Sequence, residues 1–167
     1  MAEEQKTRLP KPGTGGQAQV AGAKKYKDFI FAVGRRRAAV ARIRVYLRVS
    51  DSLKFGELSI KKGDLVVNGK NIAQYFSGNV AKAIYEEPLR VTNSLSKYAI
   101  TARTQGGGFQ SQLGAWVLGV SRALAVVDEA NKPLLRKKGL LTRDSRIRER
   151  RKVGMGGKAR RKRQSPK

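Results

Sequence analysis

Two residue types are missing from this chain: its 167 residues include no cysteine and no histidine. The chain therefore has no thiolate nucleophile, no imidazole for acid–base chemistry, and none of the ligands that zinc fingers and most transition-metal sites use. Disulfide bonds are excluded for the same reason. Acidic residues number only 12 and show no metal-ligand spacing, so we expect no catalytic activity, no metal site and no cofactor.

Long apolar segments are also missing, because no apolar run reaches the roughly 18 residues that a membrane-spanning helix needs. The first residues, Met-Ala-Glu-Glu, carry early acids and no apolar stretch, which is typical of neither a signal peptide nor a transit peptide. We expect a cytoplasmic protein with no membrane partner.

Positive charge is what the chain has in excess. Its 37 Lys and Arg residues against 12 Asp and Glu give a formal net charge of +25. Residues 140–167 alone hold 12 bases and 2 acids and no aromatic residue. Such a segment cannot offset an ordering cost of roughly 1–2 kcal/mol per residue with a core of its own. A polyanion such as nucleic acid would order it, because basic side chains release the counterions condensed on phosphates.

Composition divides the chain into three parts. Residues 1–26 are rich in Gly, Pro, Gln and Lys, and we expect them to be a disordered extension. Residues 27–139 have the size of one ordinary domain, which we expect to be globular and to bind RNA. Residues 140–167 are the expected extended basic C-terminal tail.

Strand patterns come first in the domain. Phe29–Val33 predicts a short buried strand, and residues 34–37 predict a turn. Residues 39–49 alternate apolar side chains with mostly Arg side chains, which predicts a strand with one apolar and one basic face. Residues 50–63 are polar and predict a loop or irregular hairpin, and 65–67 predict a strand before a tight turn at Asn68 and Gly69.

Helix patterns dominate the second half. Short helices are predicted at 71–76 and at 80–87, the second capped by Asn79 and ended by Pro88. A further strand is predicted at 95–104. A long amphipathic helix follows, because apolar residues recur at steps of three and four at Leu113, Val117, Val120, Leu124 and Val127. A last helix at 132–138 precedes Gly139, a suitable left-handed C-cap. One sheet covered on one face by helices is the expected packing, an α+β two-layer domain.

Several clusters suggest binding. Arg42 and Arg44 lie on the basic face of the second strand, and Arg suits phosphate because its guanidinium makes bidentate hydrogen bonds. Gly106-Gly107-Gly108 matches neither the Walker pattern nor G-x-G-x-x-G, so it indicates either a tight strand-to-helix connection or a contact with an RNA backbone. No aromatic pair of the kind found on single-strand-binding sheets is visible, so base reading is not expected.

Taken together, the motifs resemble the universal ribosomal protein nine family of the small subunit. The resemblance covers about residues 29–160. It is carried by Gly34–Arg42, Val67–Lys70 with Tyr75-Phe76, Gly106–Gly108 with Gln112 and Gly114-Ala115, Gly119–Leu124, Leu141–Asp144, Glu149–Gly154 and Lys158–Arg161. The chain departs from the family in a longer loop at Ser50 to Gly63, a longer N-terminal extension, and a terminus without the usual last Arg.

The resemblance implies a β-β-β-α-β-α domain with a left-handed crossover, an exception to the usual rule. It also implies binding to rRNA in the head of the small subunit, packing beside other head proteins, and a tail that reaches the anticodon stem-loop of the P-site tRNA. Residues expected to bind rRNA are Arg35, Arg36, Arg37, Arg42, Arg44, Gly106, Gly107, Gly108, Gln112, Arg122, Arg143, Arg146, Arg148, Arg150, Arg151, Lys152, Lys158 and Arg160. Residues expected to bind tRNA are Arg161, Lys162, Arg163 and Lys167.

We therefore expect a structural constituent of a cytoplasmic ribosome that supports translation and forms no homo-oligomer. The main alternative is a free basic nucleic-acid chaperone or compacting protein, which would bind polyanions without one fixed site. A nucleotide-dependent enzyme using the Gly106–Gly108 loop is a remoter one, and an organellar ribosome is the alternative location.

Overall fold

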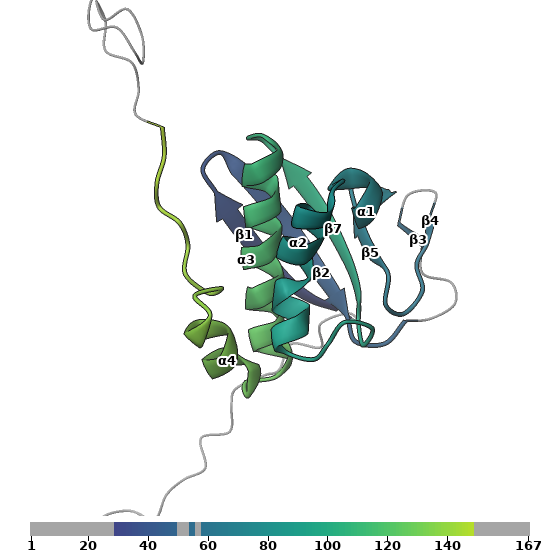
Figure 1. Ribbon diagram of the computed structural model, residues 1–167. Coiled ribbons are helices and arrows are strands. Elements are labelled where there is room, and N and C mark those ends of the chain that lie inside the picture. Colours follow the sequence, from purple (N-terminus) through teal and green to yellow (C-terminus); the bar gives the residue numbers. More distant parts are fainter. Residues whose placement is uncertain (1–28, 50–53, 56–57, 149–167) are drawn as a thin grey trace, which may run out of the picture.

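The computed structural model describes residues 29–49, 54–55 and 58–148, and these form a sheet with helices packed against it (Figure 1). The strands are β1 (Phe29–Arg36), β2 (Ala39–Tyr46), β3 (Lys54–Phe55), β4 (Leu58–Ser59), β5 (Leu65–Val67), β6 (Lys70–Asn71) and β7 (Ala99–Gln105). The helices are α1 (Ile72–Tyr75), α2 (Asn79–Val91), α3 (Phe109–Val127) and α4 (Asn131–Lys137). The extension at residues 1–26 and the end of the tail lie outside the described residues.

The main sheet has the strand order β1-β2-β7-β5-β6. Strand β2 runs antiparallel to both of its neighbours, β1 and β7, whereas β5 and β7 are parallel. Parallel neighbours need a crossover connection, and here α1 and α2 provide it. This is the connection for which the resemblance predicts a left-handed course.

Two layers result from the alternation in β2. Its apolar residues Ala39, Ala41, Ile43 and Val45 are fully buried under the helices, while the Arg side chains between them are exposed. Helix α3 lies across this face beside α2 (Figure 1), and Leu113, Trp116, Val120 and Leu124 are among its buried residues. The α+β two-layer prediction is confirmed. No described helix is long and apolar enough to cross a membrane.

Helix α3 packs unusually close to the edge strand β1. A Cβ atom on Gly34 would overlap the carbonyl oxygen of Ala115 and come within 2.9 Å of the Cα of Gly119. Glycine is therefore required at Gly34 by the approach of the two backbones, with Gly119 facing it from the helix. This contact fixes the helix layer against the sheet and leaves the other face of β1 and β2 free.

Three sequence predictions about element boundaries are wrong. Gly34, Arg35 and Arg36 belong to β1 and not to a turn, because Arg35 pairs with Val40 and Arg36 with Ala39, leaving a two-residue hairpin loop. The first strand is also an edge strand that leaves Phe31 half exposed, not a buried one. Residues 95–98 precede the strand, which begins at Ala99 after a hydrogen-bonded turn.

The second helix also differs from its prediction. Gly78, not Asn79, occupies the N-cap position, and Pro88 lies inside the helix instead of ending it. The ring removes one donor, but the carbonyl of Pro88 still accepts from the backbone N–H of Thr92 at 3.3 Å. Burial of Pro88 and Leu89 in the core favours continuing the helix to Val91.

The loop at 50–63 and the C-cap of α4 agree better with the sequence, whereas the body extends further than predicted. Residues 54–55 and 58–59 pair as the small β3–β4 hairpin, as the irregular-hairpin option predicted. Gly139 has φ +72° directly after α4, which confirms the left-handed C-cap. Leu140 and Leu141, expected in the tail, pack against the core, so the ordered body continues past residue 139.

Candidate nucleic-acid interface

The helix-free face of the sheet carries a cluster of exposed guanidinium groups. Arg42 and Arg44 extend from β2, as the sequence predicted, and Arg103 extends from β7. Arg42 is the cross-strand partner of Arg103, so the two side chains stand next to each other on the same face. Arg103 was missed because only the register of β2 and β7 brings it into the cluster. Three positive charges with exposed planar donors suit a phosphate backbone.

Aromatic rings lie among these Arg side chains, contrary to the expectation from the sequence. The ring centroids of Phe29 and Tyr46 are 5.6 Å apart. The guanidinium carbon of Arg44 lies 5.0 Å from the Phe29 centroid, and that of Arg103 lies 5.7 Å from the Phe55 centroid. These are cation–π distances. The period-2 spacing of Phe29, Phe31 and Val33 was the available signal, but the pairing with β2 and the return of Phe55 are not visible locally.

The three consecutive Arg residues do not form one cluster. Arg35 lies on β1 in the row that pairs with Val40, on the helix-free side. Arg36 points to the helix side, where its side chain lies against Gly114. Arg37 occupies the hairpin turn with φ +52° and is exposed. Alternation along the strand separates the three side chains, so only Arg35 and Arg37 remain directed away from the helices.

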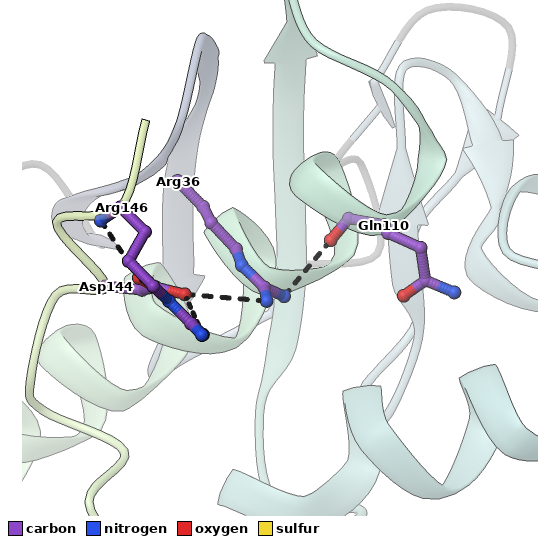
Figure 2. Close-up of polar contacts among 4 residues, drawn as sticks. All are labelled: Arg36, Gln110, Asp144 and Arg146. Atoms are coloured by element: carbon purple, nitrogen blue, oxygen red, sulfur yellow. Dashed lines mark hydrogen bonds and ion pairs between the residues drawn. The ribbon is translucent and has the colours of Figure 1, made fainter. Parts of the chain in front are cut away.

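Arg36 connects the body to the start of the basic tail (Figure 2). Its guanidinium lies between the carbonyl oxygen of Gln110, 3.4 Å away, and the Asp144 carboxylate, 3.6 Å away. Arg146 binds the same carboxylate through two side-chain nitrogens at 3.0 and 2.9 Å, and through its backbone N–H at 3.1 Å. We call these three residues, Arg36, Asp144 and Arg146, the tail latch.

The electrostatics of the tail latch favour a charged carboxylate. The side-chain hydrogen bonds from Arg146, followed by its backbone N–H, hold the pKa of Asp144 well below its usual range. Hydrogen bonding to Asp144 in turn raises the pKa of Arg146. Two guanidinium groups thus share one acid, and the segment after residue 144 leaves the body at a defined point.

The glycine loop is explained mainly by packing. A Cβ on Gly106 would lie 2.5 Å from the carbonyl oxygen of Ala38, and one on Gly107 would lie 3.0 Å from Ala39. Both residues also have positive φ, +73° and +63°. Gly108 is the N-cap of α3 and faces open space. The tight-connection alternative therefore accounts for Gly106 and Gly107, and Gly108 stays available for an RNA contact.

The side chain of Gln112 makes hydrogen bonds within the protein. Its side-chain oxygen accepts a hydrogen bond from the Tyr75 hydroxyl at 2.8 Å, and its amide nitrogen donates to the Gly106 carbonyl at 3.1 Å. Tyr75 continues the chain to Asn68 and Thr104 through contacts of 3.2 Å. We call Asn68, Tyr75, Thr104 and Gln112 the polar network. It joins the turn after β5 to the glycine loop.

The remaining predicted residues are distributed along the chain. Arg122 donates from Nη1 to the carbonyl of Val33 at 2.8 Å and so ties α3 to the edge strand. Arg143 and Arg148 are exposed in the segment after α4. Outside the described residues lie Arg150, Arg151, Lys152, Lys158, Arg160, Arg161, Lys162, Arg163 and Lys167.

Comparison with known proteins agrees with these observations. The sequence profile of the family described as ribosomal protein S9/S16 matches residues 34–167. The small ribosomal subunit protein uS9 of Maridesulfovibrio salexigens is 40% identical over 131 residues, covering 78% of this chain and 91% of that protein. The protein of the same name from Porphyromonas gingivalis is 39% identical over 127 residues, covering 76% of this chain and 89% of that protein.

Proposed function

This chain belongs to the ribosomal protein S9/S16 family, and from that premise we propose that it binds small-subunit rRNA and reaches the P-site tRNA with its tail. Family membership makes it a structural, non-enzymatic constituent of the small ribosomal subunit. A free compacting protein and a nucleotide-dependent enzyme are no longer needed to explain the chain.

One observation supports the rRNA contact most directly. Arg42, Arg44 and Arg103 project from neighbouring strands on a face that no described helix covers. Arg side chains held on a rigid sheet lose less freedom on binding phosphate than the same side chains on a loop. We assign the positioning of the body on rRNA to this face, with little reading of base sequence by these three residues.

The tail contact rests on the charge and the position of residues 149–167. The tail latch gives the basic segment one point of departure from the body. Arg161, Lys162, Arg163 and Lys167 are the tail residues assigned to tRNA, and Arg150, Arg151, Lys152, Lys158 and Arg160 to rRNA. Residues 149–167 can span at most about 65 Å, at roughly 3.3–3.6 Å per residue. That reach allows the tail to act far from the face that holds the body.

The rRNA contact is tested with a transcript of the head domain of the small-subunit rRNA. The double variant Arg42→Gln/Arg44→Gln should weaken binding and lower the slope of log affinity against log salt by about 0.7–0.9 for each lost phosphate contact. The matched control is Arg90→Gln/Lys97→Gln, which removes the same charge from α2 and the turn after it. Equal slopes for both double variants would refute the assignment of this face.

The tail contact needs a separate measurement, the dissociation rate of P-site tRNA from programmed small subunits. Deleting 164–167 should raise that rate slightly, and deleting 158–167 should raise it further while subunit assembly continues. If the longer deletion leaves the rate unchanged, the tail has no tRNA role. Co-sedimentation of the full chain with small subunits in high salt is the control for specific assembly.

A further inference from the structure

The helix-free face of the sheet is hollowed between β1, β2 and β7. A cavity of about 110 Å³, partly open to solvent, lies over the rows in which Phe31 pairs with Arg44 and Arg44 with Thr101. A closed cavity of about 150 Å³ is known to bind benzene, so this smaller hollow takes a planar ring only with part of the ring outside its opening.

Two phenylalanine rings form the apolar walls of the hollow. Phe31 comes from the edge strand β1 and is 49% exposed, although it is a large apolar side chain. Phe55 comes from the β3–β4 hairpin, which folds over the same face and also packs near Tyr46 and Ile60. The two rings therefore come from two different elements of the fold. Aromatic side chains on a binding surface stack on nucleobases of any sequence.

One residue that lines the cavity, Thr101, is almost fully buried. Thr101 is 1% exposed and lines the cavity, and its Oγ1 makes no hydrogen bond to any other described residue. The oxygen itself has almost no accessible surface, so Thr101 faces the cavity with its apolar part and a ligand there would not meet the hydroxyl.

The rim is basic. Arg42, Arg44 and Arg103 surround the opening, and none of the described residues lining the cavity is acidic. The guanidinium carbons of Arg44 and Arg103 each lie over an aromatic ring, at a cation–π distance. Among the described contacts, none of the three Arg side chains donates to a protein acceptor. A phosphate next to an inserted base would find donors at the right place.

We propose that this cavity binds one unpaired nucleotide of RNA, with its base against Phe31 and Phe55 and its phosphate on Arg42, Arg44 and Arg103. Aromatic rings and a basic rim together match a nucleotide better than an acidic peptide, because one nucleotide carries both a planar base and a phosphate. The proposal rests on the rRNA-binding function and adds a base pocket to a face otherwise expected to contact only phosphates.

The test compares two probes of equal charge on the full chain. These are a fluorescein-labelled hexauridine and a hexameric abasic ribose-phosphate with the same label. The wild type should bind hexauridine about 5- to 150-fold more tightly, the range expected from one stacked base. Phe31→Leu should abolish that preference, whereas Phe31→Tyr should keep it. Equal affinity of the wild type for both probes, or a full preference in Phe31→Leu, would overturn the proposal.

Two further variants separate the parts of the pocket. Thr101→Val should leave the binding of both probes unchanged, because it keeps the shape of the lining and removes only a hydroxyl that has almost no accessible surface. Arg103→Gln should weaken both probes and lower the salt slope by about 0.7, the value for one contact with a single strand. An Arg103→Gln variant that binds both probes as tightly as the wild type would contradict the position assigned to the phosphate.

One measurement needs no variant. A hexamer with 2-aminopurine at one internal position should lose fluorescence on binding the wild-type chain, because stacking quenches this base; unchanged fluorescence at saturation would refute the pocket.

A peptide of alternating Glu and Phe that displaces the abasic and uridine probes alike would assign the cavity to a protein partner instead. Failure of the proposed function is a different result, namely wild-type protein that does not co-sediment with small subunits.

Discussion

The two faces of the main sheet are built from alternate residues of the same strands. On the helix-covered face, β2 contributes Ala39, Ala41, Ile43 and Val45, all with no exposed surface. On the helix-free face the same strand contributes Arg42 and Arg44, which are exposed. Moving one residue along β2 thus changes the environment from apolar core to basic surface. Because the side chains alternate, variants on the two faces should affect different measurements.

The largest effect is expected where the helix layer touches the sheet most closely. Gly34→Ala would place a methyl group against the backbone of α3 at Ala115, which cannot move without displacing the helix. We expect a loss of about 3 kcal/mol in the free energy of unfolding, at the upper end of the overpacking range. Urea denaturation measures it. Gly108→Ser is the control, because Gly108 faces open space and Ser is a good N-cap, so its change should stay within about 0.5 kcal/mol.

A second pair of variants tests the two faces at adjacent positions. Ile43→Ala removes a fully buried side chain and should cost about 2–4 kcal/mol, whereas Arg42→Ala should change stability by less than about 0.5 kcal/mol. The affinity for head-domain rRNA should respond in the opposite way. It should be lower for Arg42→Ala and unchanged for folded Ile43→Ala. An Arg42→Ala variant that unfolds as readily as Ile43→Ala would show that the two faces are not separable.

Local sequence patterns were sufficient to predict the strands and helices that bury one face in the core. The alternation in β2 and the three-and-four spacing in α3 predicted both elements, because each period is a local property of the chain. Most of the predicted core residues are buried, but β2 ends at Tyr46 before the exposed Leu47, and Val117 and Val127 are only partly buried. Predictions failed where packing overrides local preference. Three adjacent Arg residues suggest a turn, but pairing with β2 keeps Arg35 and Arg36 in the strand. Pro88 suggests a helix end, but burial continues the helix past it.

The sequence predicted the site residues that lie on one strand, but not those that neighbouring strands bring together. Arg42 and Arg44 share a face by alternation alone, so their neighbouring position followed from the sequence. Arg103, Phe31 and Phe55 join them only through the strand register and the return of the β3–β4 hairpin, and no local period encodes either. Asn68 and Gln112 belong to motifs that carry the family resemblance, and Gln112 was expected to bind rRNA. Their side chains instead make hydrogen bonds within the polar network.

A third prediction concerns the polar network, which joins the turn after β5 to the glycine loop. Asn68 donates to the carbonyl and hydroxyl of Thr104 at 3.1 Å, and its Oδ1 accepts from the Thr104 N–H at 2.9 Å. Asn68→Ala leaves that buried N–H without a partner and should cost about 1–3 kcal/mol. Asn68→Gly should recover about 1 kcal/mol of this loss, because φ is +50° at this position. Thermal unfolding of both variants compares them, and a more stable Ala variant would contradict the role of the positive φ.

The smallest effect is expected at the tail latch, which lies at the exposed surface and belongs to neither face. Asp144 has its pKa lowered chiefly by Arg146, so its carboxylate should stay charged from pH 8 down through the usual range of an Asp near 3.9. Because the folded-state pKa is depressed, the contribution of the latch is fully present above the unfolded pKa and disappears as the pH falls through the folded one. Carboxyl NMR titration of Asp144 should therefore show no step between about pH 3 and 5, the range in which an ordinary Asp titrates. In Arg146→Gln the pKa of Asp144 should rise toward its usual value, and Arg143→Gln, which keeps both latch cations, should leave it unchanged. Equal titration in Arg146→Gln and the wild type would mean that Arg36 alone holds the carboxylate, and the tail would then leave the body without a fixed direction.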